Sequence, residues 1–461
     1  MQIEFSGATR EVTGSCHIVR ANGKTILLDC GLFQGRRHDT GMKNRRLPCP
    51  IVEIDAVVLS HAHLDHAGRL PFLVNQGYRN PIHATKATAD LCAIMLADSA
   101  RIQASDVAFL TRHHRPADPP LYVLRDAAGA EELMRTHDYD EWFDVLPGIR
   151  ARYTDAGHIL GSASVTIEAT EEGRVSRLVF SGDIGRAGLP IIRDPQPPTD
   201  AADVVIMEST YGNRDHESVA SARDRLAQVV RETAARGGRV LIPAFAVGRA
   251  QELVYDLHIL ARDGAIPQVP IFIDSPLATA ATAVFEDNTN ILDSTEAPVR
   301  EIEHLFRFEL LTYTNSVEES KALNTRVGPM IIIAGSGMVE GGRILHHLLT
   351  GASNPRNTVL IVGFQAENTL GRRIVERRPV IRVLGEDVEL RAKVEIINGY
   401  SAHADRTELA KWLGAVRAKS PRLGQVCLVH GEPEAQEALT AALAAQAYTV
   451  ISPVAGDRVT C

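Results

Sequence analysis

The feature of this sequence that most restricts its fold is a set of short apolar runs, each of which ends in a polar side chain. The runs are 25–29, 56–60, 178–183, 204–208 and 426–430, and they end in Asp29, Ser60, Asp183, Glu208 and His430. Their length and β-branched content are typical of buried strands. Because ligand sites in layered α/β folds gather at the carboxyl ends of strands, the pattern predicts an α/β protein with a functional site there. The alternative for any single run is that its polar residue only starts a turn.

Length and charge exclude several classes of protein. The chain has 461 residues and a formal net charge of -8, which argues against a protein that coats nucleic acid through bulk positive charge. No apolar run approaches the ~18 residues of a membrane span, and the first residues lack the pattern of a signal peptide. We therefore expect a cytoplasmic protein without membrane contact. Its six scattered cysteines contain no CxxC pair and are expected to be free thiols.

The segment from about 212 to 385 alternates between strand-like and helix-like patterns. Strands are predicted over 239–245, 269–274, 329–334 and 358–363, and helices over 222–235, 249–262 and 344–349. This alternation predicts a parallel, doubly wound sheet that forms a domain of its own. The stretch 286–327 is polar and less periodic, so we expect helices and loops outside that sheet.

The most specific chemical signal is the run from His61 to His66, which reads HAHLDH. It places three of the 17 histidines of the chain and one carboxylate within six residues. Imidazole and carboxylate ligands suit zinc and similar divalent ions, and a site without cysteine is typical of hydrolases. His61 and His63 lie two apart on an extended segment and point the same way, whereas Asp65 and His66 open the next turn toward a second ion. The alternative is a group of surface histidines at the start of a helix.

This run resembles the metal-binding signature of the metallo-β-lactamase superfamily, in which later His, Asp and His ligands follow. The later motifs occur in order at 155–162 (DAGHILGS), 181–183 (SGD) and 429–432 (VHGE). The resemblance implies an αββα sandwich that binds two divalent ions, foremost Zn²⁺, with Mn²⁺ as the alternative. One ion would be held by His61, His63 and His158, the other by Asp65, His66 and His430, with Asp183 as the bridge. Asp29 would orient ligand histidines.

With further motifs, the sequence resembles the β-CASP group of nucleases. Within this group it is most similar to the bacterial and archaeal RNA-specific ribonucleases that are related to the cleavage and polyadenylation endonuclease subunit. The motifs are 208–212 (ESTYG), 401–405 (SAHAD), 430–432 (HGE), 243–249 (PAFAVGR), 274–277 (DSPL) and 336–343 (SGMVEGGR). In this group a β-CASP domain, built on a parallel sheet flanked by helices, is inserted into the metallo-β-lactamase domain. The resemblance implies a metallo-β-lactamase domain over 1–208 and 386–461, with the inserted domain over 209–385.

The resemblance also implies a reaction, the hydrolysis of RNA phosphodiester bonds by a hydroxide that two metal ions activate. The expected catalytic residues are Asp183, Glu208 and His403. A carboxylate such as Glu208 keeps an imidazole such as His403 protonated and oriented toward the leaving 3′ oxygen. The structural alternatives are Glu208 as a helix cap or ion-pair partner, and His403 as a cap of the helix that begins near residue 406.

Candidate phosphate-binding residues lie on the inserted domain, where glycine-exposed amides, a helix N-terminus and guanidinium groups combine into an anion site. They are Ser336, Gly337, Gly341, Gly342, Arg343, Thr369, Gly371 and Arg372. Asn368 stands where relatives mostly have glycine, and it tolerates left-handed backbone better than most residues. The alternatives are a tight strand-to-helix turn and a solvated helix face. We expect RNA to bind in a groove between the domains. The sequence does not distinguish a monomer from a homodimer.

Three functions fit these motifs. The first is a metal-dependent ribonuclease of RNA processing or decay, acting as an endonuclease, a 5′-to-3′ exonuclease or both. The second is a small-molecule metallo-hydrolase of thioesterase or lactonase type, because the metal motif alone occurs widely in the superfamily. The third is a non-catalytic RNA-processing subunit. All seven ligand positions are filled, and this argues against the third function. The inserted domain and the Glu208/His403 pair favour the ribonuclease.

Overall fold

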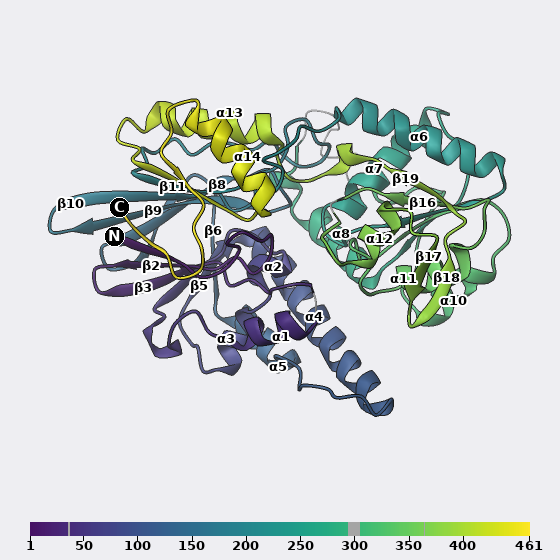
Figure 1. Ribbon diagram of the computed structural model, residues 1–461, viewed down its shortest axis with the longest axis horizontal. Helices are drawn as coiled ribbons and strands as arrows, with labels where there is room; N and C mark the ends of the chain where they lie inside the picture. The colour runs from purple at the N-terminus through teal and green to yellow at the C-terminus, as the bar shows by residue number, and fades with distance from the viewer. Residues whose placement is uncertain (36, 294–304, 364) are drawn as a thin grey trace. The chain divides into compact units, whose positions relative to one another are not determined.

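The chain forms two compact units (Figure 1), and its computed structural model describes residues 1–35, 37–293, 305–363 and 365–461. The first unit consists of Met1–Ala187, Arg193–Asp215 and His403–Cys461. The second consists of Gly188–Ile192 and His216–Ala402. The second unit is therefore inserted into the sequence of the first.

Among the described residues, the first unit contains two seven-stranded sheets. One has the order β22 (Arg458–Thr460), β1 (Gln2–Phe5), β2 (His17–Ala21), β3 (Lys24–Leu28), β4 (Ala56–Val58), β5 (Ile82–Thr85), β6 (Met134–His137). The other has the order β21 (Val450–Ile451), β20 (Gln425–Val429), β11 (Val204–Glu208), β10 (Arg174–Phe180), β9 (Ala163–Glu171), β8 (Ile149–Asp155), β7 (Trp142–Leu146). Apolar side chains from both sheets, such as Phe5, Ile167 and Ile206, form one buried core.

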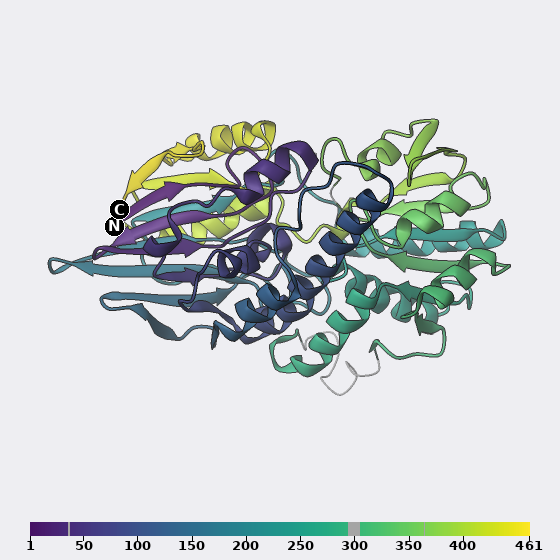
Figure 2. The same cartoon turned by 90° about the horizontal axis from the view of Figure 1, so that it is seen from below.

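Helices cover the outer face of each sheet of this unit. Those of the first sheet are α1 (Arg37–Arg45), α2 (Leu64–Ala67), α3 (Leu70–Asn75), α4 (Lys86–Arg112) and α5 (Leu124–Glu132), with the short 3₁₀ helix η1 (Ile51–Glu53). Helix α4, dark blue in Figure 2, packs on β5 and β6. On the second sheet, α13 (Arg406–Lys419) and α14 (Pro433–Ala444) pack Leu413 and Leu439 against Met207. These layers confirm the expected αββα sandwich.

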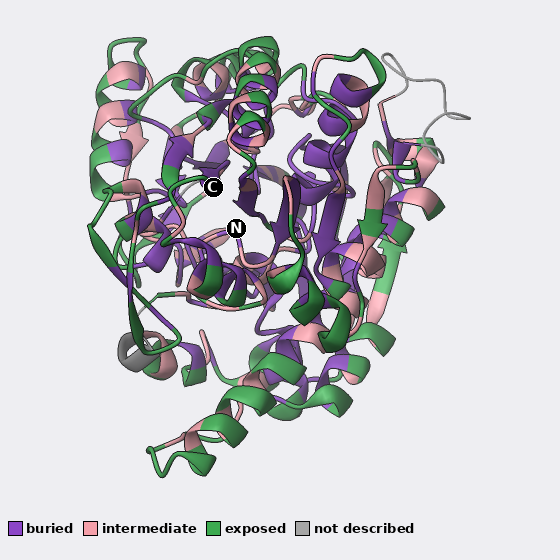
Figure 3. Ribbon diagram, turned by 90° about the vertical axis from the view of Figure 1, so that its right-hand side faces the viewer, coloured by how far each residue is buried: buried purple, intermediate pink, exposed green. Residues whose placement is uncertain are grey.

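The five apolar runs of the sequence are strands, as predicted. Strands β3 and β4 are parallel neighbours, and so are β10, β11 and β20. Parallel neighbours end at the same edge of their sheet, so the polar residues that follow these strands come together there. Strands β11 and β20 are almost wholly buried, which is the reason why their sequences are almost wholly apolar. Buried parts of the chain are coloured purple in Figure 3.

Within the described residues, the second unit is built on a six-stranded parallel sheet, which confirms the sequence prediction. Its order is β14 (Leu311–Tyr313), β13 (Ile271–Asp274), β15 (Met330–Ala334), β12 (Arg239–Pro243), β16 (Thr358–Ile361), β19 (Lys393–Ile396). The surrounding elements are α6 (Val219–Ala235), α7 (Arg249–Arg262), α8 (Pro276–Asp287), η2 (Thr289–Ile291), α10 (Val317–Thr325), α11 (Ile344–Gly351), α12 (Leu370–Val375), the hairpin β17 (Val380–Val383) and β18 (Glu386–Glu389), and η3 (Asn398–Tyr400). Leu241, Ile332 and Val359 pack with α11 and α12 on one face of this sheet.

Two details of this unit differ from the sequence expectation. Residues 311–313 form the edge strand β14, which is too short to show a recognisable alternation, so the expectation of helices and loops alone over 286–327 was wrong there. Residues 294–304 of that stretch lie outside the described residues. The expected boundary at 385/386 precedes β18 and β19, which pair with β17 and β16. This pairing keeps residues up to Ala402 with the second unit.

Two further expectations concern the thiols and the membrane. All six cysteines are free thiols, as expected from their spacing. Across the described ranges, no helix has both the length and the apolar character that crossing a membrane requires.

Candidate metal centre

The seven predicted ligands lie together where strands of the first unit end. They are His61, His63, Asp65, His66, His158, Asp183 and His430, and they follow β4, β8, β10 and β20. The ligand atoms of His61, His63, His158 and Asp183 all lie within 4.8 Å of one another, and so do those of Asp65, His66 and His430. Two groups of donors thus meet in one place, although their residues are spread over most of the chain.

The first group is three imidazoles around one carboxylate. Nδ1 of His63 lies 3.1 Å from Nε2 of His61 and 3.2 Å from Nε2 of His158. Oδ2 of Asp183 lies 3.5 Å from Nε2 of both His61 and His158. The rings of His61 and His63 lie 4.9 Å apart, and the backbone of His63 has φ -56° and ψ 147°.

The second group faces the other oxygen of the same carboxylate. Nε2 of His66 lies 3.3 Å from Nε2 of His430, which is 3.5 Å from Oδ2 of Asp65. Oδ1 of Asp183 lies 3.3 Å from Nε2 of His66 and 3.5 Å from Nδ1 of His430. Asp183 therefore presents one oxygen to each group.

The donor atoms fit a dinuclear metal site better than a hydrogen-bonded network. Three imidazole nitrogens and one carboxylate oxygen converge in the first group, which is a donor set typical of a zinc site. Oδ1 of Asp183 is buried, and within the described residues no donor reaches it with hydrogen-bond geometry. Lone pairs that face each other in a buried place repel unless a cation lies between them.

The protonation states of His61, His63 and Asp65 agree with this interpretation. Burial lowers the pKa of His63 to about 4 and holds the pKa of His61 well below its usual value, so both imidazoles are neutral near pH 7. Burial would raise the pKa of Asp65, but the hydrogen bond with His430 and the nearby imidazoles lower it to about 2. Neutral imidazoles and ionised carboxylates are the forms that bind metal ions. Burial lowers the pKa of His66, but Asp183 and Asp29 outweigh it and hold that pKa above its usual value, so a bound ion would replace the proton of His66.

Asp29 holds one of the imidazoles in place. Its Oδ2 lies 2.7 Å from Nδ1 of His66, which turns Nε2 of that ring toward Asp183. Asp29 in turn accepts hydrogen bonds from the backbone N–H of Ser60 at 2.8 Å and from the hydroxyl of Ser15 at 3.0 Å. In the sequence, Ser60 is only the end of an apolar run and Ser15 belongs to no recognisable pattern, so neither supporting residue could be predicted from it.

Direct backbone contacts fix the loops that carry the ligands. A Cβ atom on Gly185 would overlap the carbonyl of Gly157, and a Cβ atom on Gly31 would overlap the carbonyl of Asp65. The N–H of Gly185 donates to the carbonyl of Ala156 at 2.8 Å. Glycine is thus required where the Asp183 loop crosses the His158 loop.

Glu208 and His403 form a hydrogen-bonded pair beside this cluster. Nδ1 of His403 lies 3.1 and 3.2 Å from the two carboxylate oxygens of Glu208. The buried Glu208 also accepts hydrogen bonds from the N–H of Ile184 at 2.7 Å and the hydroxyl of Thr210 at 2.6 Å. Burial lowers the pKa of His403, but Glu208 and Asp183 outweigh it and raise that pKa to about 9.

The capping alternatives for this pair do not hold, whereas Glu208 does form an ion pair, with His403. The cap of α13 is Asp405, whose side chain accepts the N–H of Glu408 at 2.9 Å, and not His403. Glu208 is the last residue of β11 and caps no helix. The pair is therefore free of the capping roles considered from the sequence, and a protonated imidazole beside a carboxylate is suited to proton donation.

The candidate phosphate-binding residues lie in the second unit, and several of them have partners within it. Arg343 donates to Oδ1 of Asp274 at 2.7 Å and to the carbonyls of Thr314 and Asn315 at 3.0 and 2.8 Å. The hydroxyl of Ser336 accepts the N–H groups of residues 340 and 341 at 3.1 and 3.3 Å. These bonds hold Ser336, Gly337, Gly341, Gly342 and Arg343 in one compact turn between β15 and α11.

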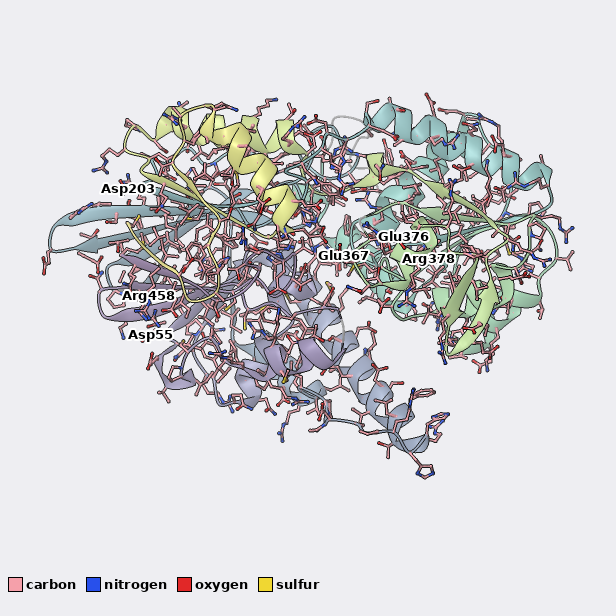
Figure 4. All side chains as sticks on the ribbon, in the orientation of Figure 1. Asp55, Asp203, Glu367, Glu376, Arg378 and Arg458 are labelled. Carbon is pink, nitrogen blue, oxygen red and sulfur yellow. The ribbon has the colours of Figure 1, made fainter. Side chains whose placement is uncertain are left out.

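The remaining candidates surround the start of α12. Thr369 caps this helix, and Nε of Arg372 lies 3.3 Å from Oε1 of Glu376. Glu376 also pairs with Arg378, and both are labelled in Figure 4. Asn368 has a φ of 67°, the left-handed conformation expected of it. The described contacts explain these residues, including Gly371 beside Gln365, as parts of the fold, and a role in phosphate binding stays a prediction.

Family models match three parts of the chain. The description "Metallo-beta-lactamase superfamily" matches residues 9–237, "Beta-Casp domain" matches residues 250–374, and "Zn-dependent metallo-hydrolase RNA specificity domain" matches residues 387–453. The order of these matches is the order of the motifs in the sequence.

Curated relatives cover almost the whole chain. "Ribonuclease TTHA0252" of Thermus thermophilus is 40% identical over 451 residues, which cover 98% of this chain and 97% of that protein. "Transcription termination factor FttA" of Pyrococcus abyssi is 33% identical and covers 94% of this chain, which spans 67% of that relative. "RNase J-like protein" of Methanocaldococcus jannaschii is 31% identical, over 93% of this chain and 92% of that protein.

A solved structure agrees with the fold. The crystal structure of a protein of unknown function from Enterococcus faecalis V583 matches with a TM-score of 0.57 and 12% identity, and covers 100% of this chain and 99% of that one. At this identity the likeness concerns the fold alone.

Proposed function

Because this chain belongs to the β-CASP family of the metallo-β-lactamase superfamily, we propose that it is a metal-dependent ribonuclease that hydrolyses RNA phosphodiester bonds. The observation that carries the proposal is the Glu208/His403 pair beside the double cluster of ligands, with Nδ1 of His403 3.8 Å from Oδ2 of Asp183. A hydrolase of small activated esters needs no such proton donor, whereas an RNA 3′ alkoxide is a poor leaving group. The RNA specificity model and the relatives named ribonuclease and RNase J-like protein support RNA as the substrate class.

The ligand assignment follows the two groups of donors. His61, His63 and His158 would hold one ion, Asp65, His66 and His430 would hold the other, and Asp183 would contribute to both groups. Zn²⁺ is the metal that this set of imidazole and carboxylate ligands favours, and Mn²⁺ is the alternative. When bound, such a pair of ions supplies Lewis-acid polarisation of phosphoryl oxygens and lowers the pKa of a water molecule.

The residues of the chain supply orientation and the proton. Nδ1 of His403 donates to Glu208, which leaves Nε2 as the nitrogen that can pass a proton to the leaving 3′ oxygen. Glu208 keeps the imidazole charged, and the bonds from Ile184 and Thr210 keep Glu208 in place. The products are a 5′ phosphate and a 3′ hydroxyl. We place this activity in RNA processing or decay in the cytoplasm. The oligomeric state, monomer or homodimer, is measured by light scattering.

The decisive experiment compares substrate classes on one preparation. Protein loaded with Zn²⁺ or Mn²⁺ is incubated with end-labelled RNA, DNA of the same sequence, a thioester and a lactone. We expect cleavage of RNA alone, and loss of that cleavage in the double variant His63→Ala, Asp65→Ala. Hydrolysis of the thioester or the lactone without cleavage of RNA would overturn the proposal, and so would full ribonuclease activity in the double variant.

The mode of cleavage requires a second substrate series. One RNA is prepared with a 5′ triphosphate, a 5′ monophosphate or a 5′ hydroxyl, and the product ends are mapped. Internal cuts that are independent of the 5′ end indicate an endonuclease. Stepwise release of mononucleotides only from the monophosphate form indicates a 5′-to-3′ exonuclease.

A further inference from the structure

A single hydroxyl in the first unit lies between the second group of ligands and the acid pair. It belongs to Thr210, two residues after the end of β11, and its oxygen lies 3.1 Å from Nδ1 of His430 and 2.6 Å from Oε2 of Glu208. Thr210, Glu208 and His430 are all buried, so these contacts are shielded from water. All three residues belong to the first unit.

The register of two strands places Thr210 beside His430. Strands β11 and β20 are parallel neighbours, and Glu208 pairs with Val429 where both strands end. The two chains stay together beyond this point. The hydroxyl of Ser209 donates to the carbonyl of Val429 at 2.7 Å, and the N–H of Ser209 donates to the carbonyl of His430 at 3.2 Å. Thr210 and His430 are therefore neighbours in space, although 220 positions separate them in the chain.

The hydrogen atoms of this contact follow from its chemistry. A hydroxyl has one hydrogen atom, and an ionised carboxylate such as that of Glu208 only accepts hydrogen bonds. At 2.6 Å it is a closer and stronger acceptor than the carbonyl of His430 at 3.1 Å, so the hydroxyl of Thr210 donates to Glu208. The lone pairs of the hydroxyl then face Nδ1 of His430, which carries the proton of that ring.

This assignment leaves Nε2 of His430 without a proton in the neutral ring. That nitrogen lies 3.3 Å from Nε2 of His66 and 3.5 Å from Oδ2 of Asp65, the other members of the second group. A metal ion at this group needs a lone pair there, whereas the other tautomer would direct an N–H at it. Oδ1 of Asp183 lies 3.5 Å from Nδ1 of His430, too far to replace Thr210 as the acceptor.

We propose that Thr210 is a positioning residue for the metal ligand His430, because its hydroxyl fixes the tautomer and the orientation of that imidazole. The same hydroxyl joins His430 to Glu208, which also accepts a hydrogen bond from Nδ1 of His403 at 3.1 Å. Glu208 thus holds the proton donor directly and a metal ligand through one hydroxyl. The inference rests on the proposed function, in which His430 binds one of two metal ions.

The second group of ligands supports both of its imidazoles at the same ring position. Nδ1 of His66 lies 2.7 Å from Asp29, and Nδ1 of His430 lies 3.1 Å from Thr210. Partners of this kind typically contribute about 10- to 100-fold to metal affinity. Packing alone does not require the hydroxyl, because a valine has nearly the shape of a threonine. Valine would leave Nδ1 of His430 and one oxygen of Glu208 without this bond.

The test measures metal binding directly and does not depend on catalysis. The full chain and its Thr210→Val and Thr210→Ser variants are freed of metal. Zn²⁺ is then titrated against a chromophoric chelator, which gives a dissociation constant for each of two ions. We expect Thr210→Val to weaken one ion by about 10- to 100-fold and the other by less than about threefold. Thr210→Ser keeps the hydroxyl and should remain within about threefold of the wild type for both ions.

The matched control is Thr314→Val in the second unit. The hydroxyl of Thr314 also donates to a buried carboxylate, Oδ1 of Asp274, at 2.5 Å, whereas all seven predicted ligands lie in the first unit. This control removes a similar bond and should leave both metal affinities unchanged. The midpoint of thermal unfolding is measured for every variant. Should Thr210→Val fail to fold, Thr210→Ala must show the same selective loss.

Three results would overturn the role of Thr210: wild-type affinities in Thr210→Val, an equal loss for both ions, or the same loss in Thr210→Ser. His430→Ala tests the assignment beneath the inference and should lose one of the two ions. If His430→Ala keeps both ions at wild-type affinity, the ligand assignment fails and the inference fails with it. If both ions bind as expected but RNA is not cleaved, the proposed function fails while the role of Thr210 in metal binding stands.

Discussion

At the scale of single residues, Asp183 is the ligand that faces both groups of donors. Its two oxygens face different groups of imidazoles, at 3.3 to 3.5 Å. Burial would raise its pKa, but the charges of His430, His66 and other imidazoles hold that pKa well below the usual range. A buried carboxylate that remains ionised without a metal is already prepared to bind one.

The first prediction concerns this shared carboxylate. Asp183→Asn should lower metal retention from about two ions per chain to fewer than one, because both groups lose their common anionic ligand. His158→Ala should lower it by about one ion, since the group of Asp65, His66 and His430 keeps its ligands. The measurement is elemental analysis after dialysis, with the exposed Asp144→Asn on β7 as the control. Two retained ions in Asp183→Asn would exclude the bridging role.

The second prediction concerns the pH dependence of the acid pair. His403 must be protonated to donate, so activity should fall as pH rises through its pKa. Although burial lowers this pKa, Glu208 and Asp183 raise it, to about 9. Glu208→Gln removes one of these charges, so the alkaline limb of the kcat profile should move to lower pH by about one unit or more.

The profile is measured with metal-saturated protein on RNA, and the exposed Glu434→Gln on α14 is the control. An alkaline limb that stays in place in Glu208→Gln, while the control behaves like the wild type, would show that His403 does not titrate in the reaction.

At the scale of elements, the site depends on loops that touch through their backbones. Gly185, after β10, lies against the carbonyl of Gly157, just before His158. Gly414 in α13 has open space around it. The two glycines therefore serve different purposes, one to allow a close approach and the other only to occupy a helix position.

The third prediction uses this contrast. Gly185→Ala should weaken metal binding by about tenfold or more, because the loop with His158 must move. Gly414→Ala should leave metal binding unchanged and stabilise the protein by about 0.5–1 kcal/mol, since alanine favours the helix. Competition with a chromophoric chelator measures the first effect, and thermal unfolding measures the second. Equal metal affinity in the two variants would contradict this account.

The elements that were predicted well are those with a strong local pattern. Helix α7 begins and ends at the expected residues, and β12 and β15 were predicted to within a few residues. Strand β14 was missed because three residues at a sheet edge show no periodicity. Its existence depends on pairing with β13, which lies some 40 residues earlier in the chain.

At the scale of the whole molecule, the charge of the chain and the charge of its site have opposite signs. The formal net charge is -8. Two bound dications against the carboxylates of Asp65 and Asp183 would leave the metal centre positive. An acidic protein can therefore still attract a phosphate group to this place.

The fourth prediction follows from that local charge. Binding of single-stranded RNA should weaken with salt, with a slope of about -0.7 in log K against log salt for each phosphate contact. Three to five contacts would give a slope of about -2 to -4. The measurement is fluorescence anisotropy with the metal-loaded His403→Ala variant, so that the RNA stays intact. An affinity that is independent of salt would contradict binding through phosphates.

The sequence alone indicated the class of the fold, and it predicted the seven donor residues and the Glu208/His403 pair that the structure brings together, because each appears in a local pattern of a few residues. Only the tertiary structure showed how these residues are held. Ser15 reaches Asp29, Ile184 reaches both Glu208 and Ala404, and Thr210 reaches His430 across 220 positions of the chain. The physical reason is that supporting contacts join polar residues of ordinary type across long separations, and neither spacing nor periodicity records such pairs.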